Sequence, residues 1–184
     1  MKKFELTAEF VTNVFGKKLF RIKALVAFGN VEKGELGGFI EKEDNLSHYG
    51  NAWVYGNAWV SGAARVSGDA QVSGDAQVSG NARVYGNAWV SGDAQVSGDA
   101  QVSGDADYAV VKGFGRYFRA TTFFRCKDKI LRVQCGCFYG DLAQFREIVK
   151  KTHGDSKYAK EYLAIADLME LHFSDEEEKQ EADE

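Results

Sequence analysis

Three cysteines and one histidine in the C-terminal third of the chain have the residue types of a zinc site. Cys126, Cys135, Cys137 and His153 supply the thiolates and the imidazole of a Cys₃His ligand set. We expect Cys135 and Cys137 on one face of a strand and Cys126 on its partner strand. The spacing matches no zinc motif, and cysteines on strands also serve as small buried hydrophobic residues. We therefore predict no metal site and no cofactor, with zinc as the alternative.

A second group of side chains is basic and aromatic, the combination that single-strand binders use to neutralise phosphates and stack bases. The candidate basic-aromatic surface consists of Arg116, Arg119, Arg125, Lys127, Lys129 and Arg132. Lys112 and the aromatic residues Phe114, Tyr117, Phe118, Phe123 and Phe124 are interleaved with it. Alternation along strands produces the same pattern when basic side chains face solvent and aromatic ones form a core. That simpler interpretation is favoured, and a nucleotide or nucleic-acid partner remains open.

The middle of the chain, which must position such groups, is one repeat. Glycine recurs every sixth residue from Gly50 to Gly104, alanine follows two residues later, and valine recurs from Val54 to Val102. This period matches no helical face, and a flexible linker would not keep its phase. Each hexad predicts a short strand and a corner, so three hexads form one coil and successive coils stack at about 4.8 Å. Valine and alanine point inward, and glycine with Asn or Asp takes the corner.

The residues on either side of each valine point outward, because side chains alternate along a strand. Sorted by face, they give three columns: Trp53, Gln71 and Trp89; Trp59, Gln77 and Gln95; Arg65, Arg83 and Gln101. Large aromatic side chains outside a solenoid indicate contact with another subunit or with flanking segments of the chain. The candidate interface residues are Trp53, Tyr55, Trp59, Tyr85 and Trp89.

The hexad VSGDAQ resembles the repeat of the left-handed parallel β-helix, or hexapeptide-repeat, proteins. The resemblance spans Gly50 to Ala106 and implies the fold and a homotrimer. It does not imply one activity, because the same coil serves acyltransferases, a class of carbonic anhydrase and polymer-forming cytoskeletal proteins. The flanking segments Phe20 to Ser47 and Thr152 to Ala164 resemble uncharacterised phage and prophage proteins that carry such repeats.

The repeat changes phase just before it becomes regular. Ile40 and Leu46 are six residues apart, whereas Leu46 and Val54 are eight apart, so we expect a two-residue insertion near Ser47 to Gly50. His48 lies in this insertion, and the resemblance raises a catalytic role because hexapeptide acyltransferases use a histidine as a base. A polar loop residue is the favoured interpretation, since no second acid or base is expected beside it.

Composition sets the remaining limits. The chain has no proline and 20 glycines, which agrees with a long sheet whose turns are marked by glycine. No apolar segment is long enough to cross a bilayer and no leader is evident, so a cytoplasmic location without a membrane partner is expected. The formal net charge of −4 is concentrated in the last eleven residues, SDEEEKQEADE. We expect them to form a disordered acidic tail.

The expected fold class is mainly β: a left-handed parallel β-helix solenoid with an N-terminal β cap and a C-terminal α+β domain. The expected boundaries are 1–49 for the cap, 50–106 for the β-helix, 107–173 for the α+β domain and 174–184 for the tail. The expected function is a non-catalytic, phage-related scaffold or binding module that is oligomeric, with a trimer favoured. Two alternatives stay open: a phage anti-defence protein that binds a host immune protein, nucleotide or nucleic acid, and a hexapeptide-repeat acyltransferase. No catalytic residue is assigned.

Overall fold

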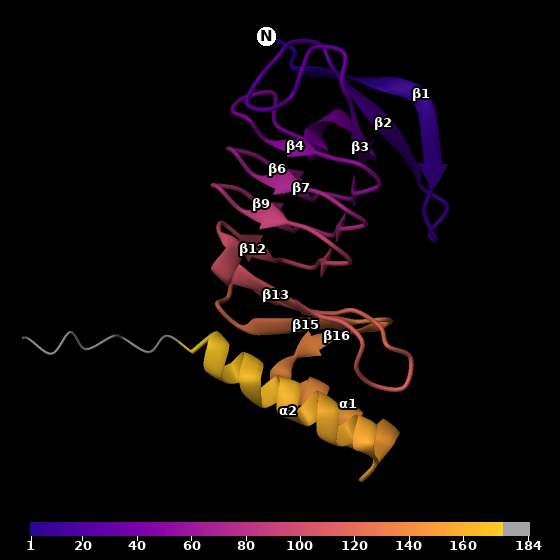
Figure 1. The fold of residues 1–184 in the computed structure, drawn as a ribbon, viewed down its shortest axis with the longest axis vertical. Helices are drawn as coiled ribbons and strands as arrows, with labels where there is room; N and C mark the ends of the chain where they lie inside the picture. Colours follow the sequence, from indigo (N-terminus) through magenta and orange to yellow (C-terminus); the bar gives the residue numbers. More distant parts are fainter. Residues whose placement is uncertain (175–184) are drawn as a thin grey trace, which may run out of the picture.

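The computed structural model describes residues 1–174, and the middle of this range is a β-solenoid of about four turns (Figure 1). Its two-residue strands are β4 (Trp53–Val54), β5 (Trp59–Val60), β6 (Arg65–Val66), β7 (Gln71–Val72), β8 (Gln77–Val78), β9 (Arg83–Val84), β10 (Trp89–Val90), β11 (Gln95–Val96) and β12 (Gln101–Val102). Each strand pairs in parallel with the strand three hexads later, which gives the stacks β4–β7–β10, β5–β8–β11 and β6–β9–β12. The predicted coil and its three faces are confirmed.

The interior of the solenoid is built from the two inward positions of each hexad. Every repeat valine from Val54 to Val102 and every repeat alanine except Ala106 is buried. The corners are tight because the coils approach backbone to backbone: Gly80 has φ 66°, and a Cβ there would lie 2.8 Å from the amide nitrogen of Gly98 on the next coil. Glycine is therefore required at this corner both for its left-handed φ and for its lack of a side chain.

The N-terminal segment forms a hairpin that joins one face of the solenoid. Strands β1 (Phe4–Thr12) and β2 (Lys18–Ala24) are antiparallel, β2 pairs with β3 (Leu36–Ile40), and β3 pairs in parallel with β5. Figure 1 shows the indigo hairpin lying beside the coils. Ile40 pairs with Val60 and Leu46 with Val66, which is two residues more than three hexads. The predicted two-residue insertion is confirmed in this first turn, which also contains a 3₁₀ helix, η1 (Glu43–Asn45).

Polar side chains close the N-terminal end of the solenoid. The Lys3 ammonium donates to the carbonyl oxygens of Ala52 at 2.8 Å and Gly50 at 3.3 Å. The Glu41 carboxylate accepts from the Gly62 amide at 2.6 Å. Without such partners, the first coil would present unpaired backbone groups to which another strand could add.

The buried Lys3 predicts a rise in stability with pH. Burial lowers the pKa of Lys3 to about 8 from 10.5, although the Asp69 carboxylate opposes the change. Between these two values the unfolded chain binds more protons than the folded chain, so the free energy of unfolding increases as the pH rises. We expect wild type to gain stability relative to Lys3→Met between pH 8 and pH 10 in urea unfolding. Ionisation of the tyrosines affects the stability of both proteins equally, so it cancels in this difference. A difference that stays constant with pH would contradict the prediction.

The C-terminal part is an antiparallel sheet covered by two helices. Its strands are β13 (Tyr108–Val111), β14 (Thr121–Arg125), β15 (Leu131–Cys135) and β16 (Phe138–Asp141), after the 3₁₀ helix η2 (Asp105–Asp107), and its helices are α1 (Leu142–His153) and α2 (Lys157–His172). Both helices are capped: Asp141 accepts from the Gln144 amide, Gly154 ends α1, and Ser156 accepts from the Ala159 amide. None of the helices within residues 1–174 combines the length and the apolar character needed to cross a membrane.

One expectation about this sheet is wrong. Cys135 ends β15, whereas Cys137 lies after it in the turn to β16, so the two cysteines do not share a strand. The reason is Gly136, whose φ of 59° lets the chain reverse there and form the separate strand β16. The acidic tail, apart from Ser174, lies outside the described residues.

The C-terminal sheet covers the other end of the solenoid (Figure 1). The Gln95 amide donates to the Thr122 hydroxyl at 2.9 Å, and the Lys127 amide donates to the Asp99 carbonyl at 3.1 Å. Phe124 of β14 packs into the same buried cluster as the repeat valines. Both ends of the solenoid are therefore covered by the chain itself, which leaves its side faces for other molecules.

Candidate functional site

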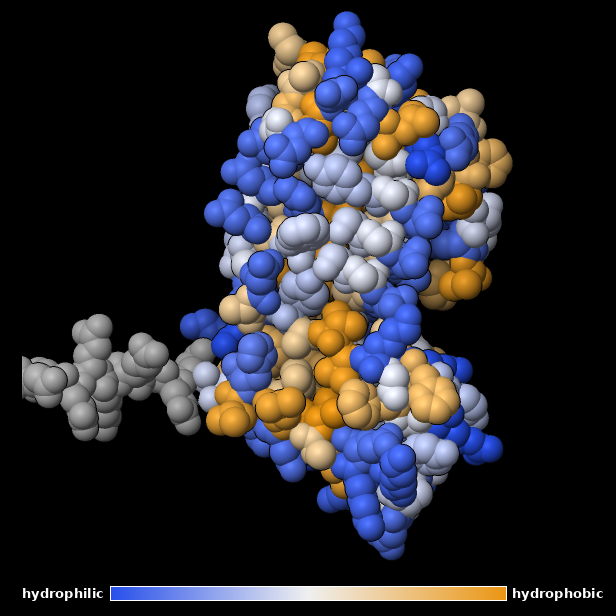
Figure 2. All heavy atoms as spheres, viewed as in Figure 1, coloured by the Kyte–Doolittle hydropathy of each residue, from blue (hydrophilic) through white to orange (hydrophobic). Residues whose placement is uncertain are grey.

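A groove of about 690 Å³ lies on the third face of the solenoid, the one formed by β6, β9 and β12. Its lining residues are Glu43, Asp44, Leu46, Ser47, His48, Tyr49, Arg65, Val66, Ser67, Arg83, Tyr85 and Gln101. The strands supply the floor, and the first turn with its two-residue insertion supplies the wall. In Figure 2 blue and pale side chains cover much of the visible surface of the coils, whereas orange ones gather over the C-terminal sheet. Most of the side chains that line the groove are polar or charged.

Two arginines, Arg65 and Arg83, line the groove together with two carboxylates, Glu43 and Asp44. Arg65 and Arg83 are direct partners in the β6–β9 ladder, so their exposed side chains leave neighbouring strands about 4.8 Å apart. Among residues 1–174 neither arginine has an ion-pair partner, and the Arg65 Nε donates only to the Asp44 carbonyl oxygen, at 3.4 Å. Like charges directly opposite on a ladder repel one another. An anion between them would relieve this repulsion.

Tyrosine rings flank these arginines. The Tyr49 side chain from the insertion is 81% exposed, and Tyr85, which follows β9, is 39% exposed. Both line the groove, so their rings are available to a planar group.

His48 is held in place by its neighbours. Its ring stacks on Phe4 with centroids 4.3 Å apart, its Nδ1 accepts from the Lys3 amide at 3.2 Å, and its Nε2 lies 3.8 Å from a Glu43 oxygen. The expectation that no acid stands near His48 is therefore wrong, because η1 brings Glu43 back toward the insertion. The Lys2 ammonium, with a smaller contribution from His48, lowers the pKa of Glu43, so this carboxyl is ionised.

The same contacts argue against His48 as a general base. A backbone amide can only donate, so the lone pair of Nδ1 is occupied and the proton of the neutral ring sits on Nε2, facing Glu43. A general base needs a free nitrogen lone pair. In this arrangement His48 is instead a hydrogen-bond donor and a stacking surface at the edge of the groove.

The five candidate interface residues do not form one surface. Trp53 is fully buried, with ring centroids 5.3 Å from Phe28 and 6.3 Å from Phe4, so the chain's own N-terminal segment covers it. This corrects its assignment as an interface residue. Tyr55 and Trp59 are half-buried. Tyr85 and Trp89 are exposed but lie on different faces, and only Tyr85 lines the groove.

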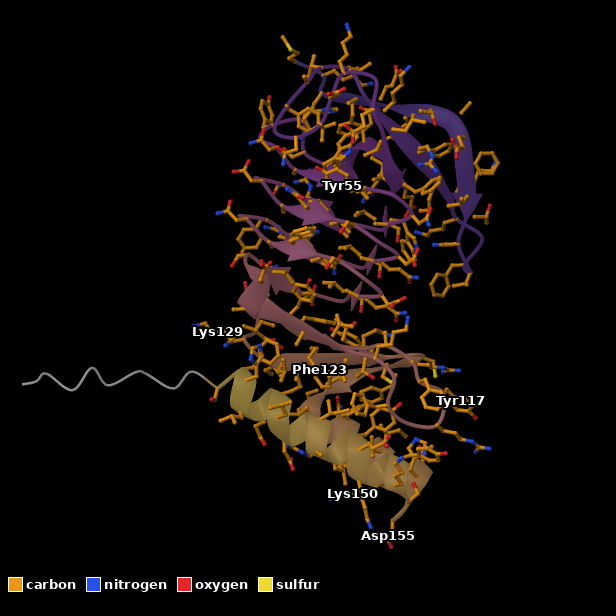
Figure 3. The ribbon with its side chains drawn as sticks, in the orientation of Figure 1. Tyr55, Tyr117, Phe123, Lys129, Lys150 and Asp155 are labelled. Atoms are coloured by element: carbon orange, nitrogen blue, oxygen red, sulfur yellow. The ribbon has the colours of Figure 1, made fainter. Side chains whose placement is uncertain are left out.

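The six members of the basic-aromatic surface are also separated. Phe123 and Phe124, which were to stack bases, are fully buried in two different clusters. Arg132 forms an ion pair with Asp128 at 2.7 Å, and Arg125 donates to the Phe173 carbonyl at 3.1 Å. Figure 3 shows Lys129 and Tyr117 on opposite sides of the C-terminal part. The two remaining arginines, Arg116 and Arg119, lie on the Tyr117 side, in the loop between β13 and β14. The hypothesis of one continuous nucleic-acid surface on the sheet therefore fails.

The zinc ligand set is not assembled either. The Cys135 thiol accepts from the Thr121 hydroxyl at 3.2 Å, Cys126 lies 4.0 Å from the Tyr139 hydroxyl, and Cys137 is exposed. Within residues 1–174, no three Cys, His, Asp or Glu side chains come together in a group that could hold a metal ion.

Comparison with known proteins identifies the repeat alone. Residues 76–92 match a family model described as YdcK Beta solenoid repeat. No curated protein matches the chain. The matched residues contain β8, β9 and β10 and include Arg83 and Tyr85 of the groove. This stretch is therefore similar to a β-solenoid repeat, in agreement with the coils that it forms here.

Proposed function

We propose that the protein is a non-catalytic β-solenoid binding module whose third-face groove holds an anion with a planar ring, such as a nucleotide. This proposal rests on Arg65 and Arg83, which are partners on neighbouring strands and have no ion-pair partners among the described residues. A guanidinium binds phosphate through two parallel hydrogen bonds, and the rings of Tyr49 and Tyr85 offer stacking surfaces for a base.

The size and charge of the groove fit this class of ligand. Its volume of about 690 Å³ lies within the range of roughly 300–1,000 Å³ that is typical of small-molecule sites. Glu43 would repel an anion, but its charge is offset by Lys2 at 2.6 Å and by the hydrogen on His48. Because the ends of the solenoid are covered, the side face is the accessible route to the coils.

The proposal extends to the type of solenoid and its setting. We propose a left-handed coil of the hexapeptide-repeat type in a phage-related, cytoplasmic protein that assembles as an oligomer, with a trimer favoured. The unbroken six-residue phase and the likeness of the flanking segments support it. Trp89 supports the oligomer, because this large side chain is 54% exposed on a face outside the groove.

An anti-defence role is the second candidate function. A phage protein that withholds a host nucleotide needs binding without turnover, and the groove offers charge and stacking while the lone pair of His48 is occupied. A host immune protein remains the other possible partner of such a module. The contacts of His48 do not favour the acyltransferase alternative.

Calorimetric titration with ATP, AMP and adenosine tests the groove. We expect ATP and AMP to bind, and adenosine to bind at least about tenfold more weakly, because one charge-assisted hydrogen bond contributes roughly 1.5–3 kcal/mol. The double variant Arg65→Gln/Arg83→Gln should bind ATP and AMP more weakly by the same factor. Lys160 is an exposed charge on α2, so Lys160→Gln should not change the affinity.

Two results would overturn the proposal. Folded wild type that binds none of the three compounds would exclude the ligand class, and nucleotide binding that survives in the double variant would exclude the groove. Native mass spectrometry of protein purified gently from bacteria then reports the oligomer and any ligand it retains. A mass other than that of a trimer would exclude the trimer as the assembly of this protein.

A further inference from the structure

A second, smaller cavity of about 190 Å³ lies in the C-terminal part, between α1 and the loop of residues 112–120. The lining consists of Arg116, Tyr117, Arg119, Cys135, Phe138, Phe145, Ile148, Val149, Thr152, His153 and Tyr162. No residue of this cavity lines the groove. Its volume equals that of about six liquid water molecules, which is too small for a nucleotide and sufficient for a single substituted ring.

Two arginines border this cavity around one aromatic ring. The guanidinium carbons of Arg116 and Arg119 lie 5.6 and 4.9 Å from the centroid of the Tyr117 ring. Among residues 1–174 neither guanidinium has a carboxylate within ion-pair distance. Arg119 also borders a separate hollow that contains Asp75 and Asp93, but the Asp93 carboxylate is paired with Lys112. Uncompensated positive charge beside an apolar cavity favours an anionic ligand.

The backbone of the loop holds these arginines in position. The Gly115 amide donates to Glu161 on α2 at 2.9 Å, and a Cβ at Gly115 would collide with the Tyr162 hydroxyl. A Cβ at Gly136 would lie 2.7 Å from Nη1 of Arg119, so the guanidinium crosses the β15–β16 turn where no side chain stands. Phe118 has φ 53°, a conformation that non-glycine residues seldom adopt and that is concentrated at binding sites.

The deeper part of the cavity is aromatic. The Phe145 ring lies 5.6 Å from Phe138 and 5.8 Å from Tyr162, between centroids, and His153 stacks on Tyr162 at 5.8 Å. Burial, and after it the neighbouring Cys135, raises the pKa of Tyr162 to about 12, so its hydroxyl remains neutral and can donate a hydrogen bond. Rings in tilted and edge-to-face contact are suited to hold another ring.

We propose that this cavity binds a small aromatic carboxylate. Its ring lies among Phe138, Phe145 and Tyr162, and its carboxylate faces Arg116 and Arg119. The planar guanidinium matches the planar carboxylate through two parallel hydrogen bonds, and the aromatic lining favours an aryl group over an alkyl chain. The site goes beyond the proposed function, because it shares no residue with the groove.

Titration calorimetry with sodium benzoate, and with benzamide as the neutral analogue of the same shape, tests this site. We expect benzoate to bind at least tenfold more tightly than benzamide, and Arg119→Gln to remove that preference. Lys160→Gln is the charge control and should leave it unchanged. Because Arg119→Gln could loosen the loop, Ile148→Trp provides a second variant: Ile148 is 38% exposed at the cavity, so a larger side chain can enter the space without disturbing the core. This variant should also lose affinity for benzoate, because the indole fills part of the cavity.

Three outcomes would overturn the proposal: no benzoate binding to folded wild type, equal binding of benzoate and benzamide, or benzoate affinity within twofold of wild type in both variants. The Arg65→Gln/Arg83→Gln double variant should bind benzoate as wild type does. The proposals for the two sites can therefore be contradicted independently.

Discussion

Replacement of Trp53 by alanine is expected to lower the free energy of unfolding by about 3–5 kcal/mol, the usual cost of removing a buried tryptophan. Trp53 has the largest side chain among the fully buried residues of the described chain, and it packs between the first coil and the rings of Phe4 and Phe28. Its loss leaves a cavity at the junction of the hairpin and the coil. We therefore expect the N-terminal segment to detach at lower urea concentration.

Trp89 is the matched control for this experiment, because it occupies the same column of the same face. It is 54% exposed and its indole donates to the Ser73 hydroxyl at 2.8 Å, so Trp89→Ala should cost much less. Among residues 1–174 the buried indole nitrogen of Trp53 has no hydrogen-bond partner, so Trp53→Phe should also cost much less than Trp53→Ala. Urea unfolding followed by circular dichroism measures all three variants. Equal losses for Trp53→Ala and Trp89→Ala would show that the hairpin does not stabilise the coil.

The contrast between these tryptophans shows what the sequence could predict. The coil follows from short-range geometry, since valine, alanine and glycine at fixed positions dictate a strand and a corner in every hexad. Both tryptophans were therefore placed correctly on the outside of the coil. The burial of Trp53 depends on Phe4, which is 49 positions earlier in the chain, and the period of the repeat cannot predict a contact with a segment outside it.

The sequence predicted only part of the groove. Sorting by face placed Arg65 and Arg83 in one column, because that step needs nothing but the period. Predicting the wall of the groove would have required the backbone path of residues 43–49, where a 3₁₀ helix turns Glu43 toward His48. The acidic pair Glu43–Asp44 just before Leu46 was the available signal, but acids five residues from a histidine seldom meet it unless a turn intervenes.

The C-terminal aromatics show a different limit. The favoured interpretation was that the aromatic residues of these strands form one core while the basic residues face solvent, but β14 has the sequence TTFFR, and adjacent Phe123 and Phe124 point to opposite faces. Both faces of β14 are covered, one by the solenoid and one by the helices. A strand that is buried on both sides keeps no aromatic surface for bases, so the exposed rings occur in the loop before it, at Tyr117 and Phe118.

The second large effect is expected at Asn45, whose side chain closes the end of the third face. Asn45 is fully buried; its amide donates to the carbonyls of Ala64 at 2.8 Å and Gly62 at 3.2 Å, and its oxygen accepts from the Lys42 amide at 2.9 Å. Asn45→Leu keeps the branching and the number of heavy atoms of the side chain and removes all three bonds. Because each buried group left without a partner costs roughly 1–3 kcal/mol, we expect a loss of about 2–4 kcal/mol after partial access of water.

Asn81→Leu separates this role from the general loss of an asparagine. The Asn81 amide donates to Asp99 at 3.0 Å on the exposed side of a corner, so its replacement should cost under about 1 kcal/mol. If the side chain of Asn45 closes the coil, Asn45→Leu should also expose the carbonyls of Gly62 and Ala64 as an edge to which other strands can add. Sedimentation velocity would then detect concentration-dependent association in Asn45→Leu and none beyond the wild-type state in Asn81→Leu. Equal behaviour of the two variants would mean that the hairpin and the first turn close the solenoid without this amide.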